Sequence, residues 1–182
     1  MKIVIDTSSL LSLVRYYLPF DTDKILYNTL KSKFESGELI VIDKVFQECN
    51  YIAKGIIITS LEYLKNKKLQ IRTEDLLPSQ KFFNQLEHQF INKTIRKKLT
   101  DLEFESRKND FLESADAKLL LYCLNDKKKN KTDTLLVTEE TESSNDNKSF
   151  KKLPAICKII DIEVKTLPEL MIILDDINLK IA

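Results

Sequence analysis

The chain has 182 residues, of which 43% are hydrophobic and 31% charged, a composition typical of a folded protein with its own core. The 29 basic and 28 acidic residues give a formal net charge of +1, so the total charge neither favours nor excludes a nucleic-acid partner. Only two glycines are present, which excludes the glycine-rich phosphate loops of nucleotide-cofactor enzymes.

The first half of the chain alternates short apolar runs with residues at helical spacing. The apolar runs predict buried strands, and the helical spacing predicts amphipathic helices between them. In chain order we expect a strand at residues 2–6, helices at 10–17 and 24–36, a strand at 39–42, helices at 44–53 and 56–66, and a short extended segment at 69–72.

The second half begins with a polar, lysine-rich stretch at residues 76–112. Its apolar residues recur at helical spacing, so we expect one long amphipathic helix over 82–99 and a shorter one over 102–111. We interpret this stretch as a helical excursion from a single domain that spans residues 1–182. After it we expect an apolar helix at 114–124 and then a lysine-rich turn. The remaining elements are strands at 134–138 and 162–166, and helices at 154–159 and 168–177.

Short buried strands that alternate with helices indicate the α/β fold class. They predict a central parallel sheet, covered on both faces by helices that connect its strands. The cysteines Cys49, Cys123 and Cys157 lie far apart among apolar neighbours, which favours buried thiols in a reducing compartment. Neither a signal peptide nor an apolar run of membrane-spanning length is present, so we expect a cytoplasmic protein with no membrane partner.

Four acids are expected at one edge of this sheet. Asp6 ends the first strand, Glu140 follows the strand at 134–138, Glu48 lies in the helix after the second strand, and Asp116 begins the apolar helix. Ligands of open α/β sheets bind at the carboxyl ends of the strands. Converging carboxylates repel one another, and a hard cation such as Mg²⁺ or Mn²⁺ relieves that repulsion. Such an ion activates water and stabilises a reacting phosphoryl group, so the pattern indicates a phosphodiester hydrolase.

Each acid taken alone also fits a plain structural role. Asp6 can be a helix cap, Glu48 a solvent-facing residue, and Asp116 a partner of the helix dipole. Asp116 is the most informative of these three, because an acid in so apolar a helix needs a partner or a ligand. The order and the context of the four acids therefore carry the interpretation.

Four segments, KIVIDTSSLLSL, VIDKVFQECNYIAKG, ADAKLLLYC and LLVTEE, resemble in this order the four acidic motifs of the PIN domain. That family comprises metal-dependent ribonucleases, including the VapC-type toxins of bacterial toxin–antitoxin pairs. The segment SFKKLPAICKIIDIEVKTLPELM resembles the carboxyl-terminal part of one PIN subgroup. The resemblance spans nearly the whole chain except its helical middle. It implies a PIN-like three-layer α/β/α sandwich with residues 76–112 as an insertion.

The resemblance also implies a site and a reaction. Asp6, Glu48 and Asp116 would bind one or two Mg²⁺ or Mn²⁺ ions, and Glu140 would take the place of a fourth acid that is Asp in many members. The implied activity is endoribonuclease cleavage of RNA that leaves 5′-phosphate and 3′-hydroxyl ends. If the protein is a toxin, a cognate antitoxin would block the groove. Family members often form homodimers through helices near the amino terminus.

Other polar residues lie close to these motifs. Thr7 or Ser8 matches the hydroxyl beside the first acid, and Thr138 precedes the fourth. Helix capping and hydrogen bonding at the strand end explain these hydroxyls equally well. Lys118 could contact an RNA phosphate, and Glu113, one helical turn before Asp116, fits either the site or an exposed position.

Two other classes of function are weighed against the nuclease. The intact acids argue against a PIN domain that binds RNA or protein without cutting, but Glu140, where an aspartate is more usual, keeps this alternative open. A haloacid-dehalogenase-like phosphatase or a receiver domain fits poorly. The phosphatase needs a second aspartate two residues after Asp6, where Ser8 stands.

Overall fold

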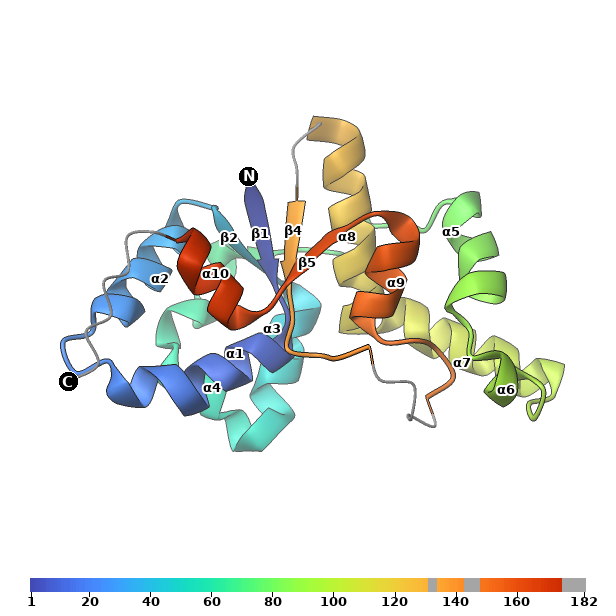
Figure 1. Cartoon of the computed structure of the whole chain (residues 1–182), viewed down its shortest axis with the longest axis horizontal. Coiled ribbons are helices and arrows are strands. Elements are labelled where there is room, and N and C mark those ends of the chain that lie inside the picture. The colour runs from blue at the N-terminus through green and yellow to red at the C-terminus, as the bar shows by residue number, and fades with distance from the viewer. Residues whose placement is uncertain (131–133, 143–147, 175–182) are drawn as a thin grey trace.

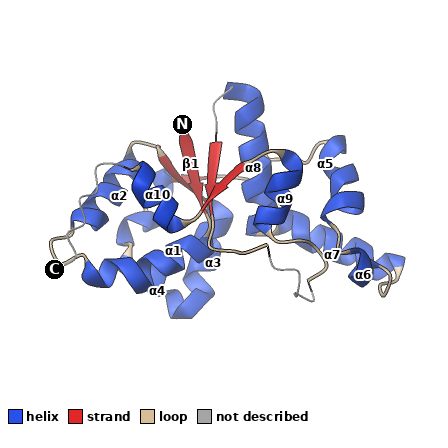
Figure 2. Ribbon diagram, viewed as in Figure 1, coloured by secondary structure: helices blue, strands red, loops and turns tan. Residues whose placement is uncertain are grey.

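A computed structural model describes residues 1–130, 134–142 and 148–174 of the chain. Its centre is a five-stranded sheet in the order β3-β2-β1-β4-β5, and every neighbouring pair of strands is parallel. Helices flank this sheet (Figures 1 and 2). The α/β class and the parallel sheet predicted from the sequence are therefore confirmed. The strands are β1 (Lys2–Ile5), β2 (Leu39–Ile42), β3 (Gln70–Ile71), β4 (Thr134–Val137) and β5 (Glu163–Lys165).

The three central strands are buried apolar runs, which is why the sequence predicts them well. Every residue of β2 and β4 is buried, as expected for parallel strands that are covered on both faces. The register pairs Ile3 of β1 with Leu39 on one side and Leu135 on the other. At the edge, the expected extended segment near residue 70 joins the sheet as the two-residue strand β3.

The helices of the first half follow the predicted positions closely, with one exception. The expected helix over residues 56–66 is wrong in length, because α4 ends at Ser60 and two 3₁₀ turns, Glu62–Lys65 and Lys67–Leu69, follow it. Before α4 the chain turns sharply, with positive φ at Ala53, Lys54 and Gly55. The helices are α1 (Thr7–Ser12), which runs on into a π turn at Leu13–Tyr17, α2 (Ile25–Glu35), α3 (Asp43–Tyr51) and α4 (Ile56–Ser60).

The prediction of one long helix over residues 82–99 is wrong. The chain instead forms α5 (Gln80–Gln85), a π turn (Leu86–Phe90) and the short α6 (Lys93–Arg96). The break falls where Ile91 is extended and pairs with Phe150 in an antiparallel bridge. The side chain of Asn92 then caps α6 by accepting a hydrogen bond from the backbone N–H of Thr94. A capping box at Thr100 starts α7 (Asp101–Glu113), which is longer than the expected 102–111.

The last three helices complete the two sides of the sheet. α8 (Ala115–Asn130) continues through the segment predicted as a lysine-rich turn, so that part of the prediction is wrong. α9 (Leu153–Ile160) and α10 (Leu167–Ile173) lie where expected, and the predicted end of the last helix at residue 177 lies outside the described residues. Figure 1 shows α8 and α9 on one side of the strands and α1, α2 and α10 on the other, with α5–α7 lying beyond α8 and α9.

The buried apolar residues form one continuous cluster. It includes Ile3 and Ile42 of the sheet as well as Phe82 and Phe90 of the helical excursion. The excursion is therefore packed onto the same core, and it can hold residues in fixed positions beside the sheet. In the described part of the chain, no helix has both the length and the apolar character needed to cross a membrane.

Candidate functional site

The four predicted acids lie at the carboxyl edge of the sheet or on the helices beside it. Asp6 follows β1, and Glu140 lies three residues after β4. Glu48 is on α3, and Asp116 is the second residue of α8. Their charges interact, because Asp6, Glu140 and Glu48 each raise the pKa of Asp116. The four acids that the sequence singles out therefore lie near enough to one another for their charges to interact.

Asp6 is held rigidly by its neighbours. Its side chain is 5% exposed. Oδ1 accepts a hydrogen bond from the backbone N–H of Thr7 at 2.6 Å, and Oδ2 accepts one from Ser8 Oγ at 2.7 Å and another from Thr138 Oγ1 at 2.9 Å. The three hydroxyl residues singled out in the sequence thus surround the first acid. In these contacts they act as hydrogen-bonding partners that fix the orientation of the carboxylate.

Thr7 links the first acid to the second. While its backbone binds Asp6, its Oγ1 donates a hydrogen bond to Glu48 Oε2 at 2.7 Å. The pKa of Glu48 is raised above its ordinary value, chiefly by burial and further by the charges of Asp6 and Glu140, and the hydrogen bond from Thr7 opposes this rise. Glu48 is therefore oriented toward the acidic cluster and is not a freely solvated residue of α3.

Asp116 is the most strongly perturbed of the four acids. Burial, followed by the charges of Asp6, Glu140 and Glu48, raises its pKa from 3.8 to about 7. No hydrogen bond or ion pair joins its carboxyl to another residue in the described part of the chain. A half-buried carboxyl without a partner is costly when it is ionised, and perturbed groups of this kind are enriched at functional sites.

Glu140 makes a second set of contacts, away from the other acids. Its Oε2 accepts a hydrogen bond at 3.1 Å from the backbone N–H of Leu153, the first residue of α9. The neighbouring Glu139 does the same for α10, where the N–H of Leu167 donates to Glu139 Oε1 at 2.6 Å. The two consecutive glutamates after β4 therefore hold the starts of the last two helices.

Lys118, two residues after Asp116 on α8, forms an ion pair with Glu113, outside the cluster. Its Nζ donates to Oε1 of Glu113 at 3.3 Å, and Lys44 Nζ donates to Oε2 of the same carboxylate at 3.3 Å. Lys118 is 5% exposed, whereas the Glu113 side chain is 67% exposed. Glu113 is thus an exposed partner of two lysines, and the contact of Lys118 with RNA remains a prediction.

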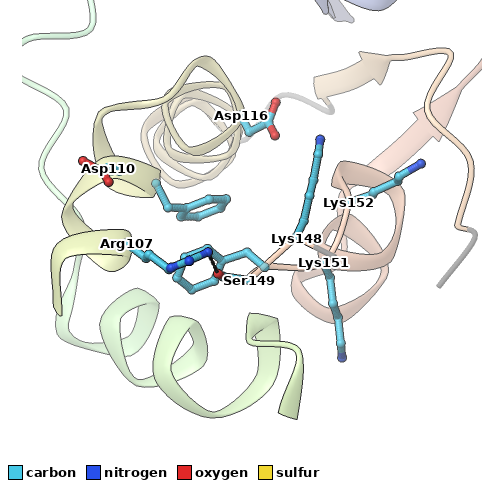
Figure 3. A pocket seen from close by; sticks show the side chains of 9 residues that line it. Arg107, Asp110, Asp116, Lys148, Ser149, Lys151 and Lys152 are labelled. Carbon is cyan, nitrogen blue, oxygen red and sulfur yellow. Dashed lines mark hydrogen bonds between the residues drawn. The ribbon is translucent and has the colours of Figure 1, made fainter. Parts of the chain in front are cut away.

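Lys148 is a residue of this site that the sequence did not reveal. Its Nζ lies 3.7 Å from Glu140 Oε1, and its charge lowers the pKa values of Glu48 and Asp116. It comes from the polar segment after β4, which carries no periodicity that could place it. With Asp116 it lines an open pocket of about 430 Å³, toward which its side chain extends in Figure 3.

The fit of a metal ion can be judged from this donor set. Among the residues that the structure describes, no three His, Cys, Asp or Glu side chains converge in the present arrangement closely enough to hold an ion. By their chemistry the acids do fit a hard divalent cation, because Asp6, Glu48 and Asp116 offer carboxylate oxygens in one another's field. Asp116 in particular has no hydrogen bond or ion pair with a described residue that it would have to break in order to bind a metal ion.

The fold and the site define an α/β protein with an acidic cluster at the carboxyl edge of a parallel sheet. A family model described as a domain of unknown function (DUF4411) matches residues 3–175, so the chain belongs to this family. The match spans the sheet, the helical excursion and all four acids. No curated protein and no solved structure matches the chain.

Proposed function

We propose that this protein is a metal-dependent endoribonuclease of the PIN type, which hydrolyses RNA phosphodiester bonds at the cluster of Asp6, Glu48, Asp116 and Glu140. The observation that carries the proposal is the state of Asp116. Its half-buried carboxyl has no partner among the described residues, and burial together with three other acids raises its pKa to about 7. A divalent cation is the ligand that turns this repulsion into attraction.

The metal ion and the residues around the cluster would have different roles in this reaction. When bound, Mg²⁺ or Mn²⁺ would supply a water of lowered pKa and a positive charge beside the reacting phosphoryl group. Asp6 and Glu48 are oriented in advance by Thr7, which donates to both carboxylates. Thr138 holds the other oxygen of Asp6, so these two acids need little reorganisation to act as ligands.

A nuclease must also bring a polyanion to an acidic site. Lys148, which pairs with Glu140 and lowers the pKa values of Glu48 and Asp116, reduces the negative field that an RNA phosphate meets there. The resemblance of the four acidic motifs to those of PIN domains supports the proposal, and the central parallel sheet is compatible with it.

A second candidate is a PIN-type module that binds RNA or protein without cutting it. The contacts of Glu140 favour this alternative, because its two oxygens hold the N–H of Leu153 and the ammonium of Lys148. In such a module the remaining acids would serve the stability of the fold or the contact with the partner.

A cleavage assay distinguishes the nuclease from the non-cutting module. It uses a panel of single-stranded and structured RNAs in the presence of Mg²⁺, Mn²⁺ or EDTA. We expect cutting by the wild type only with a metal, loss of cutting in Asp6→Asn, and normal cutting in Glu113→Gln. The last variant is a matched control, because Glu113 lies one turn before Asp116 and pairs with lysines instead of the acids. No cutting of any RNA, together with no metal binding by calorimetry, would favour the non-cutting module.

A further inference from the structure

The pocket beside Asp116 is lined mainly by cations and aromatic rings. Its volume of about 430 Å³ falls within the range of small-molecule sites, which is roughly 300–1,000 Å³. The cations are Arg107 of α7 and the lysines 148, 151 and 152, and the rings are Phe111 and Phe150. Four cations face two acids there, Asp110 and Asp116, so the lining favours an anionic ligand. Figure 3 shows Asp116 at the rim nearest Lys148, with Arg107 on the opposite side beside Ser149.

The helical excursion builds this pocket. α7 supplies Arg107 and Phe111 directly. The turn before α6 fixes the lysine-bearing segment, because the N–H of Asn92 donates to the carbonyl of Ser149 at 2.8 Å and the N–H of Lys151 donates to the carbonyl of Phe90 at 2.9 Å. Residues 148–152 therefore lie between the acidic cluster and the excursion and are fastened to the latter by backbone hydrogen bonds.

The aromatic rings form a ladder that ends at the pocket. Phe111 and Phe150 have ring centroids 4.6 Å apart and an interplanar angle of 34°, and Phe104 lies 6.5 Å beyond Phe150. Arg96 covers the far end, with its guanidinium 4.5 Å from the Phe104 centroid. Phe111, at the other end, is half-buried and lines the pocket. Phe111 and Phe150 are therefore the rings of this ladder that a planar ligand in the pocket would meet.

We propose that this pocket holds one unpaired nucleotide of an RNA strand next to the bond that is cut. The base stacks on Phe111, and the phosphate meets Arg107 and the lysines of residues 148–152. Stacking on an aromatic ring requires a base that is not paired, so the site selects single-stranded RNA. This inference rests on the proposed nuclease function and gives the helical excursion a role in choosing the substrate.

A binding experiment with a fluorescein-labelled single-stranded RNA decamer and the full chain tests the proposal. Fluorescence anisotropy measures the binding, and EDTA is present so that the RNA is not cut. Phe111→Leu keeps the apolar bulk but removes the ring, and we expect it to raise Kd by about tenfold. Lys151→Gln removes one exposed cation, which should lower the slope of log K against log salt by about 0.7. Lys128→Gln is the matched control, because Lys128 is an exposed lysine in the last turn of α8, whereas the pocket residue Asp116 is in the first turn of that helix. This variant should leave both Kd and the salt slope unchanged.

The outcomes separate the pocket from the nuclease. An unchanged Kd in Phe111→Leu together with an unchanged salt slope in Lys151→Gln would show that the pocket does not bind a nucleotide, even if the wild type cuts RNA. RNA that binds with both expected dependences but is never cut would support the pocket and refute the nuclease. A duplex that binds as tightly as the single strand would overturn the choice of an unpaired base. If thermal unfolding shows that Phe111→Leu does not fold, the exposed Lys151 decides by itself.

Discussion

The perturbed pKa of Asp116 makes a quantitative prediction about stability. In the metal-free protein the folded state keeps a proton on this carboxyl up to about pH 7, whereas the group has an ordinary value of 3.8. Between these two values the folded state binds more protons than the unfolded chain, so stability falls as the pH rises through this window. The ionised carboxyl is thus a cost that the fold carries fully above pH 7, and Asp116→Asn removes it.

The size of the effect follows from the two pKa values. At 1.36 kcal/mol per pKa unit, the difference of about three units corresponds to about 4 kcal/mol, and solvent that reaches the half-buried side chain reduces this to about 2 kcal/mol. We therefore expect Asp116→Asn to be more stable than the wild type by about 2–4 kcal/mol at pH 8 in EDTA. At pH 4 the two proteins should be almost equally stable, because the wild-type carboxyl is then protonated in the folded state.

Urea unfolding followed by circular dichroism, at several pH values between 4 and 8 in EDTA, measures this difference. Saturating Mg²⁺ should stabilise the wild type at pH 8 and leave Asp116→Asn nearly unchanged, because binding to the folded state alone adds about 2.7 kcal/mol at a hundred times Kd. An Asn variant that is less stable than the wild type at pH 8 in EDTA would show that the ionised Asp116 carboxyl does not destabilise the fold, as would identical pH profiles for the two proteins.

Three further predictions concern residues around the cluster and the excursion. Thr138→Val removes the hydrogen bond to Asp6 and should lower the free energy of unfolding by about 1–2 kcal/mol in urea titrations; no loss would mean that this contact is dispensable. Thr100→Ala removes the cap of α7 and should cost about 1 kcal/mol, with faster amide exchange confined to the start of that helix, whereas exchange that rises uniformly would contradict the capping role. Lys148→Gln should raise the pKa of Asp116 further, seen as an upward shift in its carboxyl titration by NMR, and a downward shift would show that Lys148 does not act on this acid.

The three central strands were predictable because each is an apolar run that only a sheet covered on both faces can bury. β2 is buried along its whole length and begins and ends where its four apolar residues do. β3 was harder to predict, because only two residues pair and neither is buried. Its place at the edge depends on the neighbouring strand β2 and not on any pattern of its own.

The helical excursion shows where periodicity misleads. Apolar residues continue at helical spacing across residue 91, yet the chain is extended there because Ile91 pairs with Phe150, which lies 59 residues away. Asn92 and Thr100 each cap a new helix after the break. These two caps could be found in the sequence, whereas the bridge that makes the break necessary is a tertiary contact.

The candidate site was only partly visible in the sequence. Asp6, Glu48 and Asp116 follow from the order of the elements, because strand ends and the helices beside them meet at one edge of a parallel sheet. The hydrogen bond from Leu153 to Glu140 and the ion pair between Glu140 and Lys148 are tertiary contacts. The sequence around Glu140 and Lys148 has no periodicity from which these contacts could be predicted.

The proposed nuclease activity requires a divalent cation that Asp6, Glu48 and Asp116 would hold and that supplies an activated water, and the chemical ends of the RNA products test this. A 5′-labelled and a 3′-labelled single-stranded RNA are incubated with the wild type and with Asp116→Asn in Mg²⁺, and the ends of the fragments are identified by mass spectrometry. We expect 5′-phosphate and 3′-hydroxyl ends from the wild type, and no products from the variant or in EDTA. Fragments with 2′,3′-cyclic phosphate ends, or products that persist in Asp116→Asn, would contradict it.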